Sequence, residues 1–137
     1  MATATLTKHG QSRFYVVGTS FGDRASTIRK NCFEGMNVIL HREPNNQHDP
    51  NAISVWVSVP GLLFGTKQKQ IGYLKKSHAA KLAKVLDAGI DYSAVIDDLY
   101  IPEPGSDVFP NVKLEVNYGG VTNQLLALSN NKQVAVK

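Results

Sequence analysis

Two histidines and two carboxylates lie within nine positions of the chain: His41, Glu43, His48 and Asp49. Imidazole and carboxylate groups bind transition metals and transfer protons in general acid–base catalysis. His41 and Glu43 would share one face of a strand, but His48 follows an irregular polar stretch, and no established ligand spacing is reproduced. A small metal-dependent nuclease using His41, His48 and Asp49 is therefore the weakest of the functions considered for this chain.

Other catalytic motifs are missing from the sequence. There is no G-x-S-x-G nucleophile elbow, no G-x-x-x-x-G-K-[ST] phosphate loop and no G-x-G-x-x-G dinucleotide motif. The single cysteine, Cys32, can form neither an internal disulfide nor a thiolate metal cluster, and it is expected to be a small buried hydrophobic residue. We therefore expect a protein that is not an enzyme and that carries no metal or other cofactor.

The stretch REPNNQHDPNAISVWV, residues 42–57, places eight polar or turn-forming residues between two β-branched runs. Asn45, Asn46 and Asp49 can bond their own backbone, which is typical of a turn. The same amides can also recognise base edges, sugar hydroxyls and phosphates. Asp49 can accept a hydrogen bond from a hydroxyl, and His48 can stack or donate. Composition leaves both interpretations open.

Two aromatic residues and two lysines occupy the ends of other predicted elements. Phe21 follows a β-rich run between two glycines, so it either projects from a loop or plugs the core beneath it. Tyr73 ends a short strand, and Lys75 and Lys76 precede a helix whose N-terminus offers free N–H groups to phosphate. On spacing alone, a solvated lysine-rich helix surface explains the two lysines better.

The hydrophobic pattern predicts the elements that must position these residues. Seven short strands are expected, at residues 13–18, 36–41, 52–57, 71–74, 92–96, 112–116 and 121–128. Residues 62–70 are expected to form a loop or a frayed hairpin. Because Trp56 alternates with valines, it points to the opposite face of its strand from them, and the core is its favoured place.

Two helices complete the pattern. The first is expected at residues 23–34, begun by an Asp or Ser cap, with Ile28, Cys32 and Phe33 on its apolar face. The second runs from the cap Ser77 to Gly89, and its apolar face is Ala79, Leu82, Ala83 and Leu86. With no βαβ regularity, these elements predict a mainly-β protein, a small antiparallel β-barrel or strongly bent sheet with helices at its ends.

Length and composition predict one domain. The chain has 137 residues, 42% of them hydrophobic and 19% charged, and no apolar run approaches the ~20 residues that span a bilayer. Residues 1–12 are expected to be a flexible N-terminal tail, 13–130 the single domain and 131–137 a flexible C-terminal tail. The N-terminus lacks a secretory signal, so we expect a cytoplasmic protein that does not contact membranes.

The charge of +4 is unevenly distributed along the chain. Residues 1–86 hold twelve Lys or Arg against four Asp or Glu, a net +8, whereas residues 87–137 hold three against seven, a net −4. A basic first part could present a positive surface to a polyanion such as nucleic acid. The alternative is that the lysines serve solubility alone.

Three segments together resemble the HIRAN domain family: FYVVGTSF, VILHREPNNQHDPNAISV and IGYLKKSHAAKLAKVLDAG. They keep the family's order and intervals from residue 14 to residue 89. The resemblance implies a modified OB-like β-barrel with added helices. It also implies a role in DNA repair or replication, binding single-stranded DNA at free 3′-OH ends, with a helicase or other DNA-processing protein as a further partner.

The same resemblance assigns roles to individual residues. Phe21 matches the aromatic residue after the first strand that holds a base, and Asn45 and Asn46 match the paired amides that contact DNA. Asp49 matches the acceptor of the terminal hydroxyl, and His48 stands where a DNA-binding member has a second, stacking aromatic residue, a tyrosine.

Tyr73 falls where the family can place a His near the DNA backbone, and Lys75 with Lys76 matches a basic pair. Ser20 stands where the DNA-binding member has an Arg, so one contact is missing. The smaller ring of His48 offers less stacking area than a tyrosine, and each stacked base contributes ~1–3 kcal/mol. These departures leave open a protein-interaction module that keeps the fold without DNA-end binding, with the apolar residues 61–64, GLLF, as its surface.

Overall fold

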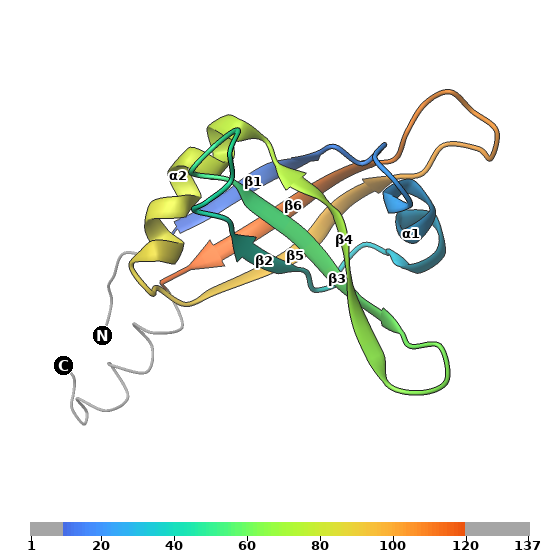
Figure 1. The fold of residues 1–137 in the computed structure, drawn as a ribbon, viewed down its shortest axis with the longest axis horizontal. Coiled ribbons are helices and arrows are strands. Elements are labelled where there is room, and N and C mark those ends of the chain that lie inside the picture. Colours follow the sequence, from blue (N-terminus) through green and yellow to red (C-terminus); the bar gives the residue numbers. More distant parts are fainter. Residues whose placement is uncertain (1–9, 120–137) are drawn as a thin grey trace.

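The structure, a computed structural model, describes residues 10–119. This part of the chain forms six strands and two helices, coloured along the sequence in Figure 1. In order they are β1 (Gly10–Val17), α1 (Arg24–Asn31), β2 (Ile39–Arg42), β3 (Ile53–Pro60), β4 (Thr66–Leu74), α2 (Lys76–Asp87), β5 (Tyr92–Tyr100) and β6 (Asn111–Tyr118). The strand predicted at residues 121–128 lies outside the described residues.

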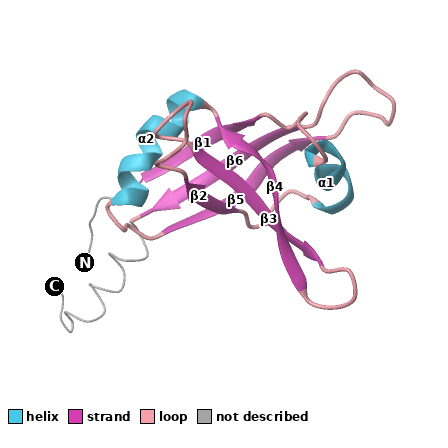
Figure 2. Ribbon diagram, viewed as in Figure 1, coloured by secondary structure: helices cyan, strands magenta, loops and turns pink. Residues whose placement is uncertain are grey.

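All six strands belong to one antiparallel sheet with the order β2-β3-β4-β1-β6-β5. Alternation explains why these segments are strands: in β3, Val55, Val57 and Val59 are buried whereas Ser58 and Pro60 between and beyond them are exposed. The sheet is curved, and α1 and α2 lie at its opposite ends, as Figure 2 shows. The predicted mainly-β fold with two helices is therefore confirmed.

The two edge strands approach each other through residues 35–38, which precede β2. The backbone of Gly35 donates to the Ile96 carbonyl at 2.7 Å, Ile96 donates to the Met36 carbonyl at 2.8 Å, and Val38 donates to the Ala94 carbonyl at 2.9 Å. Tyr92 of β5 adds its hydroxyl, which accepts from the Leu40 N–H at 3.0 Å. The sheet thus curls into an incompletely closed barrel, consistent with a modified OB-like fold.

The core fills the inside of this curved sheet. Its fully buried side chains contribute ~1.5–3 kcal/mol each for the larger aliphatic residues. From the helices it receives Ile28 of α1 and Leu82 of α2, with the small residues Ala79 and Ala83 allowing α2 to approach closely. The sheet contributes most of the remainder: Ile53, Val55, Val57, Ile71, Ile96, Val112, Leu114 and Val116.

Gly72 fixes how β4 passes from β3 to β1. A Cβ at this position would lie 2.5 Å from the Val17 carbonyl oxygen and 2.7 Å from a methyl of Val16, so any larger residue would separate β4 from β1. Just before it, the register between β3 and β4 shifts by one residue at Val55/Trp56. The result places Tyr73 opposite Ser54 on one side and opposite Val17 on the other.

Of the two alternatives predicted for residues 62–70, the loop is wrong and a hairpin is formed, because residues 66–74 are a single strand paired with β3. Its first part, TKQKQ, has no apolar residue, which is why the sequence indicated a loop or frayed hairpin for residues 62–70. This part is a strand because it pairs with β3 from Val57↔Lys69 to Pro60↔Thr66, and the two strands are the two arms of one long hairpin. Only the turn at residues 61–65 remains irregular.

Three smaller predictions also need correction. Ser77 lies inside α2, whose N-cap is Lys75, and no side chain caps this helix. Phe33 lies beyond the end of α1 and is 59% exposed, because α1 ends three residues earlier than its pattern indicated. Trp56 is half-buried rather than part of the core. Cys32 is also half-buried and packs against the core as a small hydrophobic residue, and burial raises the pKa of its thiol to about 11.

Candidate nucleic-acid interface

The loop between β2 and β3, residues 43–52, is held by its own side chains. The Asn46 side-chain oxygen accepts from the backbone N–H of His48 at 2.9 Å and of Asp49 at 3.0 Å. The Asp49 Oδ1 accepts from the backbone N–H of Asn51 at 2.9 Å. Asn46 and Asp49 therefore do perform the work of turn residues, and Asn46 has little left to offer a ligand.

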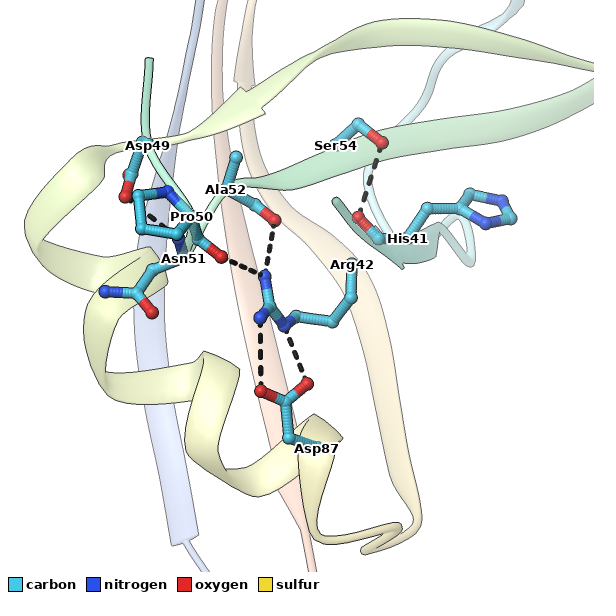
Figure 3. A network of polar contacts seen from close by, with 8 residues as sticks. All are labelled: His41, Arg42, Asp49, Pro50, Asn51, Ala52, Ser54 and Asp87. Atoms are coloured by element: carbon cyan, nitrogen blue, oxygen red, sulfur yellow. Dashed lines mark hydrogen bonds and ion pairs between the residues drawn. The ribbon is translucent and has the colours of Figure 1, made fainter. Parts of the chain in front are cut away.

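Arg42 connects this loop to α2 (Figure 3). Its Nε and Nη2 donate to the two carboxylate oxygens of Asp87 at 2.8 and 3.1 Å, and its Nη1 donates to the carbonyls of Pro50 and Ala52, both at 3.0 Å. The Arg42 hydrogen bond lowers the pKa of Asp87, so the pair stays charged. One half-buried guanidinium thus fixes the far side of the loop against the helix.

Glu43 connects the near side of the loop to β4. Its Oε1 accepts from the Tyr73 hydroxyl at 2.9 Å and from the Asn46 amide at 3.1 Å. Burial alone would raise the pKa of Glu43, but hydrogen bonds from Asn46, Ser54 and Tyr73 together hold it below its usual value. Burial, then the Glu43 hydrogen bond, raises the pKa of Tyr73, so its phenol stays protonated as the donor.

Phe21 stands beside this arrangement, on the connection from β1 to α1. Gly18, with φ of +74°, lets the chain leave β1 in a tight turn, and Phe21 follows with 66% of its surface exposed. Arg24, the first residue of α1, donates to the Gly18 carbonyl at 2.9 Å. The Arg24 guanidinium carbon is 5.6 Å from the ring centre of Phe21 and equally far from that of Tyr73, within cation–π range.

The lysine pair lies directly after Tyr73. Lys75 is the N-cap of α2 and Lys76 its first residue, and both side chains are exposed. The ammonium of Lys75 lies 5.8 Å from the ring centre of Tyr15. A phosphate at this place would meet two cations and the positive end of the helix dipole.

His41 and His78 have structural roles. His78 accepts at Nδ1 from the backbone N–H of Tyr15 at 3.1 Å, and burial with the charges of Lys75 and Lys81 lowers its pKa. His41 lies against Trp56 and its Nε2 is 3.1 Å from the side-chain oxygen of Gln68. Within residues 10–119 no three His, Cys, Asp or Glu side chains are grouped so as to hold a metal.

The structure therefore connects four of the eight predicted site residues, Phe21, Asn46, Asp49 and Tyr73, through two that the sequence did not indicate. Glu43 links the loop to Tyr73, and Arg24 links Tyr73 to Phe21. Asn45 and His48 are exposed beside this network, and their side chains take no part in it. Arg24 was not predicted because it lies on α1, and no pattern in the sequence indicates that this helix approaches Tyr73. Glu43 was considered only as a partner of His41.

The exposed half of this arrangement suits a single nucleic-acid strand. It offers an aromatic surface at Phe21, cations at Arg24, Lys75 and Lys76, and a carboxylate at Asp49. Aromatic faces, cations and hydroxyl acceptors are the groups that bind bases, phosphates and sugar hydroxyls.

No helix among the described residues is long and apolar enough to cross a membrane.

Comparison with known proteins shows the family and the fold. The family model of the HIRAN domain matches residues 9–116. A crystal structure of a protein from Lactobacillus plantarum superposes with a TM-score of 0.60 at 24% identity, covering 81% of this chain and 97% of that one. The crystal structure of the HIRAN domain of human HLTF superposes with a TM-score of 0.50 at 24% identity, covering 90% and 88%.

A search among curated proteins finds no match. The family match alone extends over most of the chain, and it includes the β2–β3 loop, Phe21, Tyr73 and the lysine pair. HIRAN is a DNA-binding domain rather than a known catalytic family, which supports nucleic-acid binding by this chain. The chain belongs to the HIRAN domain family.

Proposed function

We propose that this protein binds single-stranded DNA at free 3′-OH ends, without catalysis, in DNA repair or replication. The observation that carries the proposal is the construction of the β2–β3 loop. Asp49 is half-buried and held at Oδ1 by the Asn51 N–H, and its Oδ2 accepts no hydrogen bond from any residue that the structure describes. An acceptor fixed in this way suits a hydroxyl donor, whereas a terminal phosphate would be repelled.

The rest of the strand would extend from this acceptor across the neighbouring groups. Asn45 and His48, exposed on either side of Asn46, contact the last nucleotide, and Phe21 stacks on a base. Asn46 acts by holding the loop, and Tyr73 by holding Glu43. Lys75 and Lys76 bind phosphate at the start of α2.

Arg24 supports this proposal by its position. The sequence lacks the Arg that a DNA-binding relative has at Ser20. Arg24 places a guanidinium 5.6 Å from the Phe21 ring, reaching the same surface from α1. Its planar group can stack with a base or bond a phosphate.

The test is fluorescence anisotropy with short labelled oligonucleotides that end in 3′-OH or 3′-phosphate. We expect tighter binding of the 3′-OH end, falling with salt because phosphate contacts release counterions. Asp49→Ala should remove the discrimination between the two ends more than it removes binding. Asp107→Ala, which removes one exposed charge from the β5–β6 loop, is the matched control. Equal affinity of the wild type for both ends would refute end reading.

A second candidate function rests on a different surface, the tip of the β3–β4 hairpin. Leu62, Leu63 and Phe64 are 95%, 86% and 88% exposed, an unusual run of three consecutive apolar side chains on a soluble surface. A helicase or other DNA-processing protein could dock there. A pull-down that survives nuclease treatment and is lost in Phe64→Ser would favour this function, and a nuclease-sensitive one would oppose it.

A further inference from the structure

A groove of about 350 Å³ lies between the start of α1 and the outer face of the β3–β4 hairpin. It is distinct from the β2–β3 loop, but it begins at Phe21 and Arg24, which form one of its walls. Its volume lies at the lower end of the range for small-molecule sites, the size of a fragment such as a nucleobase. Among the residues that line it are Phe21, Arg24, Trp56, Gln68, Lys69 and Gln70.

Trp56 is an aromatic surface held in one orientation. Its indole N–H donates to the Ser54 hydroxyl at 2.8 Å, and Ser54 is fully buried. The His41 ring meets the indole edge-on, with centroids 5.4 Å apart and an angle of 78° between the planes. His41 is itself fixed by Gln68, which is 3.1 Å away. A half-buried indole held on two sides can accept a stacked base without first losing rotamer freedom.

The polar groups of the groove complement a nucleotide. Gln70 donates to the Gly72 carbonyl at 3.1 Å, which orients its amide, and Gln68 precedes it by two residues on the same strand, β4. Lys69 is paired with Asp23, whose pKa this hydrogen bond lowers, so the two charges offset each other. Arg24 is then the unbalanced cation among the side chains that form this groove.

We propose that this groove binds a second base of the DNA strand, stacked on Trp56 and lying 5′ of the base held by Phe21. The inference rests on the proposed function, because Phe21 and Arg24 belong to both surfaces and give the strand its path. With the 3′ end at Asp49, the strand leaves past Phe21 in the 5′ direction and meets the groove next. Because Lys69 is already paired with Asp23, the indole ring is the main contact that the groove offers, so the base rather than the phosphate backbone enters.

The single tryptophan of the chain makes the inference directly measurable. The full-length protein is titrated with oligothymidylates from dinucleotide to octanucleotide, each with either 3′-OH or 3′-phosphate, while its intrinsic fluorescence is recorded. We expect quenching with the longer oligonucleotides, and with both kinds of end, because the groove lies away from the end-reading loop. The dinucleotide should leave the fluorescence unchanged.

Two variants test the stacking itself by anisotropy with the octanucleotide. Trp56→Leu keeps an apolar side chain but removes the flat surface, and should weaken binding about tenfold, the equivalent of ~1.4 kcal/mol. Trp56→Phe keeps a ring and should recover most of that affinity. Circular dichroism spectra and urea midpoints of both variants show whether they are folded.

The outcomes separate the two proposals. Binding with unchanged fluorescence, and equal affinity of folded Trp56→Leu and wild type, would overturn the groove and leave end reading intact. Quenching and loss in Trp56→Leu without any preference for 3′-OH would support the groove and overturn end reading. Failure of every oligonucleotide to bind would overturn both.

Discussion

The two ends of β3 carry connections of opposite character. Before it, the loop of residues 43–52 is polar, and its side chains satisfy its own backbone through Asn46, Asp49 and Arg42. After it, the turn of residues 61–65 is apolar, closed by one backbone bond from Gly61 to the Gly65 carbonyl at 2.9 Å, with three hydrophobic side chains exposed. Figure 1 shows the polar loop beside α2 and the apolar turn projecting from the body.

The two connections differ in how many of their side chains are left free to contact a ligand or partner. In the polar loop, most side-chain hydrogen-bonding groups are used within the loop to fix its conformation. The few groups that remain are therefore held in place before a ligand binds. The apolar turn contributes almost no burial to the fold, and its side chains remain available for contact. The presence of a reactive residue type is therefore weaker evidence of a binding site than a side chain that the loop does not need for its own hydrogen bonds or packing.

The largest expected effect comes from removing the anchor of the polar loop. Arg42→Ala removes four hydrogen bonds: it leaves the Pro50 carbonyl without the Arg42 donor and the Ala52 carbonyl with the Glu43 backbone N–H alone. We expect the free energy of unfolding to fall by about 2 kcal/mol, because charge-assisted bonds of a largely buried group are lost. Preference for 3′-OH over 3′-phosphate ends should fall with it, since Asp49 loses its fixed place.

Urea denaturation and the paired-end anisotropy assay measure both consequences. Lys84→Ala, which removes an exposed cation from α2, the helix that Arg42 contacts through Asp87, controls for lost charge and should change stability by less than about 0.5 kcal/mol. If Arg42→Ala were as stable as the control, the loop would not depend on its anchor, and the contrast with the apolar turn would disappear.

The neighbouring amides Asn45 and Asn46 give the next effect. Asn46→Ala removes the acceptor for two backbone N–H groups and should lower the free energy of unfolding by about 1 kcal/mol. Asn45 is exposed, and Asn45→Ala should leave stability within about 0.5 kcal/mol while weakening DNA binding. Thermal melting and anisotropy of the two variants separate the roles. Equal stability of both would show that Asn46 does not hold the loop.

The apolar turn should respond in the opposite way. Replacing Leu62, Leu63 and Phe64 together by Ser removes no core contact, because all three are almost fully exposed. We expect the free energy of unfolding to change by less than about 0.5 kcal/mol and solubility to rise. Affinity for oligonucleotides should be unchanged. A clear loss of stability in urea would mean that the turn packs against the body and is not a free surface.

Local pattern predicted much of the fold. Val55 and Val57 alternate strictly, and Ala79, Leu82 and Ala83 follow helical spacing, so β3 and α2 were expected close to where they lie. The first part of β4 was not expected, because TKQKQ has no apolar face. Only the ladder with β3 makes it a strand, and a ladder is a property of two segments.

The candidate site divides in the same way. The loop residues were found together because they are adjacent in sequence, and Phe21, Tyr73 and the lysine pair were added by family resemblance. Arg24 and Glu43 each contact Tyr73, across 49 and 30 residues of sequence respectively, and no local spacing indicates these contacts. The Trp56 surface was missed because alternation tells which face a side chain is on but not what covers that face.

The smallest expected effect is the acid dependence that Glu43 contributes. Its pKa in the folded protein lies below the usual value, so the unfolded chain binds a proton first as pH falls. The stability that Glu43 contributes is therefore fully present above its unfolded pKa of about 4.3 and is lost as pH falls through the lower folded pKa. Glu43→Gln cannot ionise, although its amide oxygen can still accept from Tyr73 and Asn46.

Urea midpoints of the wild type and Glu43→Gln, measured from pH 7 to pH 3, isolate this contribution. Other carboxylates with lowered pKa values, Asp23 and Asp87, titrate in both proteins and cancel in the comparison. We expect the wild type to be more stable at pH 7 and the gap to close as the solution becomes acidic. A gap that stays constant with pH would mean that the charge of Glu43 does not hold the loop to Tyr73, and that the polar loop is fixed from the Arg42 side alone.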